Sequence, residues 1–198
     1  MKRSAVVVAL VAIALAIVGE AFAAGEEPVV YFRMPDGLFQ KACAKKVWSG
    51  VTAKFAGAKD VREAREIGIQ VKGDSEIRVY SNPSVDVLMT DALGDLFEEC
   101  GMNLVAKVPE GGTVIEAEVR EFFVGVEKGT VTGRSEAQSL ITFNIKKGGQ
   151  ITSVDVGMEV DAKGVRKKKI KAVSDAANRL LAETLKAIPE NRYMKEIK

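Results

Sequence analysis

Three consecutive segments in the second half of the chain constrain the fold more than any other feature, because apolar residues recur there at every second position. They cover about residues 115–126, 131–145 and 152–160, and glycine-containing joints separate them. A period of two is typical of strands with one buried face, and short joints favour antiparallel pairing. The apolar parity reverses once, near Arg120 and Glu121, which indicates a β-bulge. We therefore predict a three-strand antiparallel meander with one face in water.

A helical pattern precedes the meander. Between residues 85 and 100 the apolar residues follow steps of three and one, which places them on one helix face. Asn82 is the expected N-cap, with Pro83 at the first helical position and Gly101 as the left-handed stop. A helix with a single apolar face needs a surface to cover, and a sheet is the simplest one.

A second amphipathic helix is expected from about residue 165 or 171 to 188, where Pro189 ends it. Shorter extended pieces are expected at 47–55, 67–71 and 77–80. The predicted fold class is therefore α+β. We expect a mixed or mostly antiparallel twisted sheet with a C-terminal three-strand meander, and two long amphipathic helices packed on one face.

The N-terminus has the pattern of a secretory signal peptide. Lys2 and Arg3 precede fourteen apolar residues, and Ala21-Phe22-Ala23 supplies the small residues of a cleavage site. The apolar run is shorter than the ~20 residues of a transmembrane helix, although an uncleaved anchor is the alternative. We predict cleavage after Ala23 and a periplasmic location.

Three regions follow from this interpretation. Residues 1–23 are the signal peptide, residues 24–46 are a leader segment whose order stays open, and residues 47–198 are a single α+β domain. Removing Lys2, Arg3 and Glu20 from the 29 basic and 27 acidic residues leaves a net charge of +1. That balance gives no reason to expect a nucleic-acid partner.

The exported chain contains two cysteines, Cys43 and Cys100, and its expected compartment is oxidising. They are candidates for one disulfide, and the alternative is two small buried apolar side chains. A reactive thiol at Cys43, with lysines nearby, is a weaker alternative because no activating partner is evident.

The chain contains no histidine, which excludes the imidazole-based triads and histidine-ligated metals. With two cysteines there is no four-ligand zinc set, and no cofactor is expected. The remaining catalytic candidates are acids on the first long helix: Asp91, Asp95, Glu98 and Glu99. Acids on a polar helix face are usually solvated, so we do not expect an enzyme.

A basic run follows the meander. Its members are Arg166, Lys167, Lys168, Lys169 and Lys171. Such a run is a candidate for contact with anionic lipid or lipopolysaccharide, whereas the favoured interpretation is a solvated connection into the last helix.

The order of these elements resembles the YajG-type family of small bacterial envelope lipoproteins, over about residues 47–198. The matching segments are DVREAREIG, VLMTDALGDLFEECGM, FFVGVEKGTVTG and AANRLLAETLKAI. The resemblance implies an α+β envelope domain with no established reaction and no catalytic residues. Family members typically carry a lipid on a cysteine directly after the signal peptide, and this sequence has none there; its first cysteine is Cys43.

We therefore predict an exported non-enzymatic binding or adaptor domain in envelope assembly or maintenance. Its expected partners are other envelope proteins or lipid and cell-wall components, with at most peripheral membrane contact, and its oligomeric state stays open. An edge strand at residues 47–55 is a candidate for accepting a partner strand. The alternative is a carrier of a small apolar ligand, lined by Leu88, Met89, Phe122, Phe123 and Phe143. A cell-wall enzyme is the second, weaker alternative.

Overall fold

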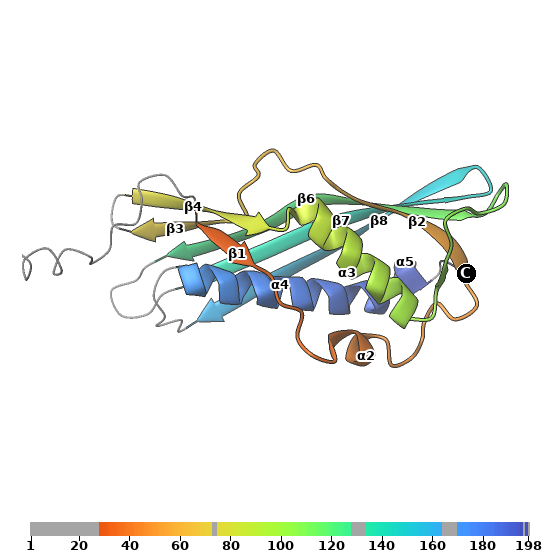
Figure 1. Ribbon diagram of the computed structural model, residues 1–198, viewed down its shortest axis with the longest axis horizontal. Coiled ribbons are helices and arrows are strands. Elements are labelled where there is room, and N and C mark those ends of the chain that lie inside the picture. The colour runs from red at the N-terminus through yellow and green to blue at the C-terminus, as the bar shows by residue number, and fades with distance from the viewer. Residues whose placement is uncertain (1–27, 73–74, 128–133, 164–169, 196, 198) are drawn as a thin grey trace, which may run out of the picture.

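The computed structural model describes residues 28–72, 75–127, 134–163, 170–195 and 197. Within them lie eight strands in a mixed sheet and four helices, two of them long (Figure 1). The elements in chain order are β1 (Val29–Tyr31), α2 (Leu38–Ala42), β2 (Thr52–Asp60), β3 (Gly68–Lys72), β4 (Ser75–Asn82), α3 (Val85–Glu99), β5 (Asn103–Leu104), β6 (Thr113–Glu127), β7 (Arg134–Lys147), β8 (Gln150–Lys163), α4 (Ile170–Glu190) and α5 (Arg192–Lys195). The mixed α and β composition that we predicted is confirmed.

Strand β6 organises the sheet. On one side it pairs antiparallel with β7, and β7 pairs antiparallel with β8. On its other side β6 pairs in parallel with β2 along its first half and with β3 along its second half. The register of β6 against β7 shifts between Val119 and Glu121, at the point where the apolar parity of the sequence reverses. Gly148 and Gly149, which join β7 to β8, both have positive φ, as a tight hairpin of this hand requires.

Both long helices lie against the same side of the sheet, α3 over β2 and α4 over β6, β7 and β8 (Figure 1). Their apolar stripes are buried as the helical periodicity predicts. The fully buried members of the stripes are Met89, Leu93, Leu96, Phe97, Val173, Ala177, Leu180, Leu185 and Ile188. Phe97 makes edge-to-face contacts with Trp48, Phe55 and Phe143, at centroid distances of 5.2, 5.2 and 6.2 Å. This aromatic cluster joins the helix layer to the sheet.

Several element boundaries differ from the prediction. Helix α4 continues through Pro189 to Glu190 instead of ending at residue 188. Helix α3 begins at Val85 with Ser84 as its N-cap, because Asn82 still pairs with Tyr31 at the end of β4 and is held in the strand. Strand β2 begins at Thr52 rather than residue 47, and it continues to Asp60, past the predicted end at residue 55. The left-handed stop is correct, since Gly101 has a φ of 93°.

The segment before the predicted domain is part of the fold from residue 28 onward. Strand β1 pairs in parallel with β4, and Val30, Leu38 and Cys43 are buried in the core. The Cys43 and Cys100 sulfurs form a disulfide with the Cα atoms 4.5 Å apart. This bond joins the segment that leads into β2 to the segment that leads into β5.

Candidate binding edge of the sheet

Strand β8 is a long outer strand. It pairs with β7 without a register shift from Gln150 to Lys163, and no other strand among the described residues pairs with it. In an antiparallel pair, alternate residues direct their N–H and C=O groups away from the neighbour. About half of the β8 backbone groups therefore face outward, and the strand contains no proline or bulge that would hinder pairing.

The two faces of β8 differ in chemistry. Even-numbered residues Val154, Val156 and Val160 are buried under the helices, whereas odd-numbered residues lie on the open face of the sheet. Asp155 and Glu159 are exposed on that open face. Asp155 accepts a hydrogen bond of 2.6 Å from the Thr142 hydroxyl, which holds its carboxylate above the strand.

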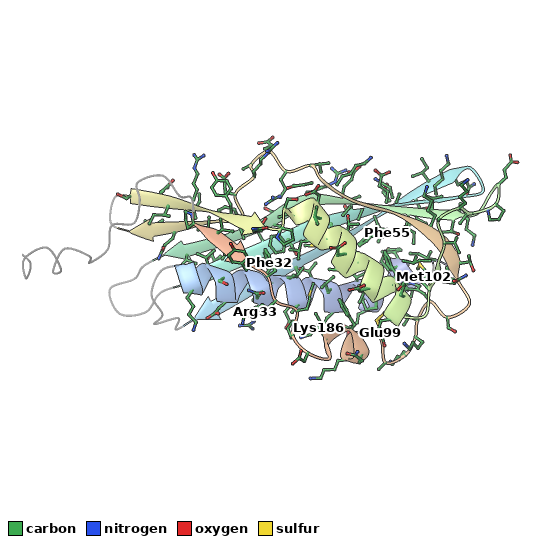
Figure 2. All side chains as sticks on the ribbon, in the orientation of Figure 1. Phe32, Arg33, Phe55, Glu99, Met102 and Lys186 are labelled. Carbon is green, nitrogen blue, oxygen red and sulfur yellow. A yellow bond between two sulfur atoms is a disulfide. The ribbon has the colours of Figure 1, made fainter. Side chains whose placement is uncertain are left out.

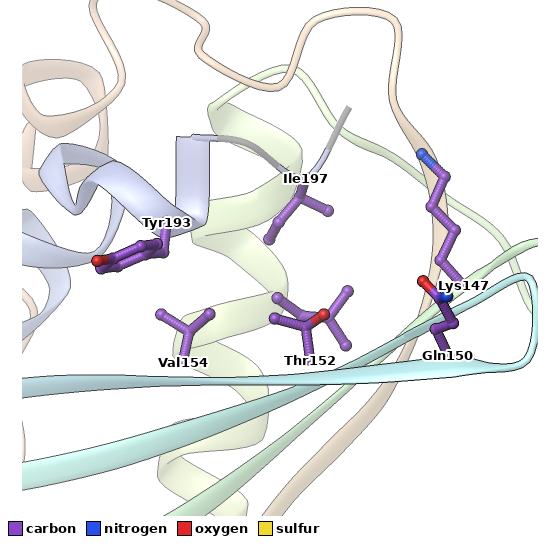
Figure 3. A pocket seen from close by; sticks show the side chains of 7 residues that line it. Lys147, Gln150, Thr152, Val154, Tyr193 and Ile197 are labelled. Atoms are coloured by element: carbon purple, nitrogen blue, oxygen red, sulfur yellow. The ribbon is translucent and has the colours of Figure 1, made fainter.

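A cavity of about 330 Å³ lies beside β8 at its hairpin end (Figure 3). Its lining residues are Ile145, Lys147, Gln150, Thr152, Val154, Tyr193 and Ile197. Figure 3 shows Tyr193 and Ile197 on the C-terminal segment above Thr152 and Val154 of β8. The cavity is thus a gap between the covered face of the sheet and the end of the chain.

The position of Tyr193 follows from how α5 is fixed. The Asn191 side chain accepts hydrogen bonds from the backbone N–H groups of Tyr193 and Met194, at 2.9 and 3.3 Å, and so caps the short helix. Met194 is fully buried, and its carbonyl accepts a hydrogen bond of 2.7 Å from the Trp48 indole. With Met194 turned inward, Tyr193 is 56% exposed at the mouth of the cavity.

The strand predicted to be an open edge, residues 47–55, does not form one. Residues 47–51 precede the strand, and β2 lies between β6 and β5. Beyond β5, the pairing of β2 with β6 shifts register between Phe55 and Ala58, and the Ala58 N–H donates to the Thr90 hydroxyl at 2.9 Å. The prediction was wrong because the short parallel partner β5 has almost no sequence signature.

A buried arginine closes the gap between β2 and β3 along β6. Arg62, whose side chain is 7% exposed, pairs with both oxygens of Asp60. Its guanidinium also donates to the backbone carbonyls of Glu66 and Phe122, at 3.1 and 2.9 Å. The Phe122 carbonyl lies in β6 between the residues that pair with β2 and those that pair with β3, so Arg62 replaces the missing strand neighbour.

A polar cavity of about 580 Å³ lies beside this loop and the start of α3. It is lined by Asp60, Arg62, Glu63, Arg65, Tyr80, Ser81, Ser84, Val85 and Asp86. A hydrogen bond from Ser84 lowers the pKa of Asp86. Asp86 lies in the first turn of α3, where a negative charge interacts favourably with the positive end of the helix dipole. On the open face, the hydrogen bond and charge of Glu116 raise the pKa of Lys59. Both shifts have ordinary structural causes.

The predicted catalytic acids do not converge. Asp91, Asp95 and Glu98 are exposed on the outer face of α3, and Glu99 forms an ion pair of 3.0 Å with Lys46. None of the described cavities is lined by these acids. Among the described residues no three His, Cys, Asp or Glu side chains could hold a metal ion.

Two other sets of predicted residues are placed as follows. Arg166, Lys167, Lys168 and Lys169 lie outside the described residues, and Lys171 is exposed in the first turn of α4. Of the residues predicted to line a carrier site, Met89, Phe122 and Phe143 are fully buried and Leu88 nearly so. Phe123 follows Phe122 in β6 and therefore faces the opposite side of the sheet. The five residues do not share one site.

Sequence reasoning missed β8 as the open edge and Tyr193 as part of a cavity. A signal for the edge was present, because the last strand of a meander has only one neighbour within the meander. The cavity had no such signal, since it depends on how α5 is capped.

Comparison with known protein families gives one match that covers most of the chain. Residues 44–197 match the family described as uncharacterized lipoprotein. No curated protein matches the sequence. Within the described residues, none of the helices is both long and apolar enough to cross a membrane.

Solved structures that match this chain have low sequence identity to it. A Xanthomonas campestris protein of the DUF330 family is 10% identical with a TM-score of 0.52, covering 71% of this chain and 82% of its own. An uncharacterized protein has a TM-score of 0.49 and 11% identity, over 83% of this chain and 98% of that one. A minor lipoprotein from Acinetobacter baumannii has a TM-score of 0.32 and 9% identity, over 85% and 91%. At such identity the first likeness shows the fold alone.

Proposed function

Since the chain belongs to the uncharacterized lipoprotein family, we propose that it is a non-enzymatic adaptor of the bacterial envelope that binds another envelope protein by strand addition along β8. The observation that carries this proposal is the fourteen-residue outer strand, which is continuous in register and contains neither a proline nor a β-bulge. The family supports an envelope location. The predicted signal peptide, with cleavage after Ala23, supports a periplasmic one.

Lipid attachment at Cys43 does not fit this structure. The Cys43 sulfur is bonded to Cys100, and the residue is buried. The proposed binding therefore uses the surface of the folded protein and no lipid on Cys43.

The scaffold supports binding better than catalysis. Its charged groups form local structural pairs, such as Arg62 with Asp60 and Arg120 with Glu118, the latter at 2.8 Å. The exposed acids of α3 line none of the described cavities. The carrier alternative stays a prediction, without a described cavity lined by the residues it requires.

Site-specific photo-crosslinking in the bacterial cell tests the proposal. A photoreactive amino acid replaces exposed Ser153 on β8 in one variant and exposed Asp91 on α3 in the matched control. We expect a discrete adduct with another envelope protein from position 153 and none from position 91. Equal adducts at both positions, or no adduct at position 153, would contradict strand addition at β8.

A further inference from the structure

We infer that the segment bound along β8 is an extended segment of another protein that is basic on one face and apolar on the other. This inference rests on the proposed function and adds the chemistry of the partner. It uses three observations: the acids of the open face, the cavity of the covered face, and the cost of pairing β8 with a second copy of itself.

The open face of β8 selects for positive charge. Asp155 and Glu159 are exposed on either side of Gly157, about 13 Å apart along the strand. Their cross-strand neighbours on β7, Thr142 and Gln138, are uncharged. Glu159 forms no ion pair among the described residues. Basic side chains four residues apart on an added strand would face both carboxylates.

A second copy of the chain fits this edge poorly. If two β8 strands pair antiparallel about Gly157, Asp155 of each copy lies opposite Glu159 of the other. Like charges directly opposite on neighbouring strands are destabilising. The charge pattern therefore favours a different, basic chain.

The covered face selects for an apolar side chain. Residues of an added strand alternate between the two faces, so those on the covered side would lie beside Thr152 and Val154. The cavity there is also bounded by Tyr193 and Ile197 (Figure 3). An exposed tyrosine at the mouth of a partly apolar cavity is the kind of residue that anchors a bound side chain. The β8 edge would thus recognise the basic face of a bound strand through its acids and the apolar face through the cavity.

The test uses the purified exported protein and a capped nine-residue peptide in which valine and lysine alternate. We expect the peptide to shift backbone amide NMR signals of β8, and a valine–glutamate peptide to leave them in place. The double variant Asp155→Lys and Glu159→Lys should weaken binding about tenfold, since it turns two attractions into repulsions. The matched control Asp91→Lys and Asp95→Lys changes the net charge equally on α3 and should bind as the unmodified protein does.

The cavity is tested separately with Tyr193→Ala, which should weaken the valine–lysine peptide about fivefold while leaving the NMR spectrum of the core unchanged. Equal binding of the two peptides, signal shifts that map to another element, or equal loss in the α3 control would overturn the inference. Crosslinks from position 153 that persist after charge reversal at Asp155 and Glu159 would also overturn it, but they would leave the proposed function standing. Absence of crosslinks at position 153 would remove the proposed function itself.

Discussion

The two sides of β6 end in different ways. On one side the sheet passes through β7 to β8, a long regular strand that has no further neighbour among the described residues. On the other side β2 is closed by short β5 and by the Thr90 hydroxyl. The outer side of β2 is thus capped along part of its length, whereas β8 carries charged side chains but has no proline, no β-bulge and no second partner strand among the described residues. A long regular edge is therefore found at β8 and not at β2.

The closed side should depend most on its disulfide. Replacing both Cys43 and Cys100 with alanine keeps two small buried side chains but removes the cross-link between two positions 57 residues apart. The chain-entropy relation gives a loss of about 4 kcal/mol in the free energy of unfolding. Urea unfolding of the oxidised protein and the double variant measures it. A loss below about 1 kcal/mol would show that this bond does not fasten the closed side.

A pair of proline variants tests whether the β8 edge is open. Gly157 and Met158 are adjacent, so one directs its N–H toward β7 and the other directs it outward. We expect one of Gly157→Pro and Met158→Pro to lose about 3 kcal/mol in urea unfolding and the other about 1 kcal/mol. Met158→Ala controls for the lost side chain. If both prolines destabilise the protein equally, the outer edge of β8 is covered.

Removing the buried arginine tests how the closed side is joined to β6. Arg62→Met removes the guanidinium from the Phe122 carbonyl and the Asp60 carboxylate, and we expect a loss of about 2–3 kcal/mol. Arg62→Lys should recover little, because one ammonium group cannot reproduce the guanidinium fork. Urea unfolding of both variants measures these losses in the free energy of unfolding. Full recovery by lysine would mean that charge alone matters there.

The smallest effect concerns the hydroxyl that caps the shifted part of β2. Thr90→Ala removes the acceptor of the Ala58 N–H, and we expect a loss of about 1 kcal/mol. Hydrogen exchange at the Ala58 amide should accelerate, whereas exchange in β8 should not change. Thr90→Ser retains the hydroxyl and serves as the control. Unchanged exchange at Ala58 in the alanine variant would show that this edge is protected by other means.

The strongly periodic elements could be predicted from the sequence. The period of two located the strands that became β6, β7 and β8, and the apolar stripes located α3 and α4. In both cases the alternation directly reports which side chains meet the core. The family resemblance is confirmed by the match over residues 44–197.

The parallel part of the sheet could not be predicted in the same way. Strand β2 pairs with β6 through residues such as Ala53 and Thr113, which are far apart in the chain, and the local sequence does not mark such a partner. For the same reason residues 47–55 were mistaken for an edge. The role of Arg62 also depends on tertiary context, because its guanidinium donates a hydrogen bond to the Phe122 carbonyl. That carbonyl lies where β6 passes from pairing with β2 to pairing with β3.

The disulfide has a further consequence for the order in which the chain assembles. Neighbouring strands of the β6–β8 meander follow one another closely in sequence, so they need little loop closure to meet. Parallel pairing of β2 with β6 requires a much longer closure. The disulfide would close most of this loop in advance, because Cys43 lies shortly before β2 in the sequence and Cys100 lies shortly before β5 and β6. We therefore expect refolding from the oxidised unfolded chain to be faster than from the reduced chain.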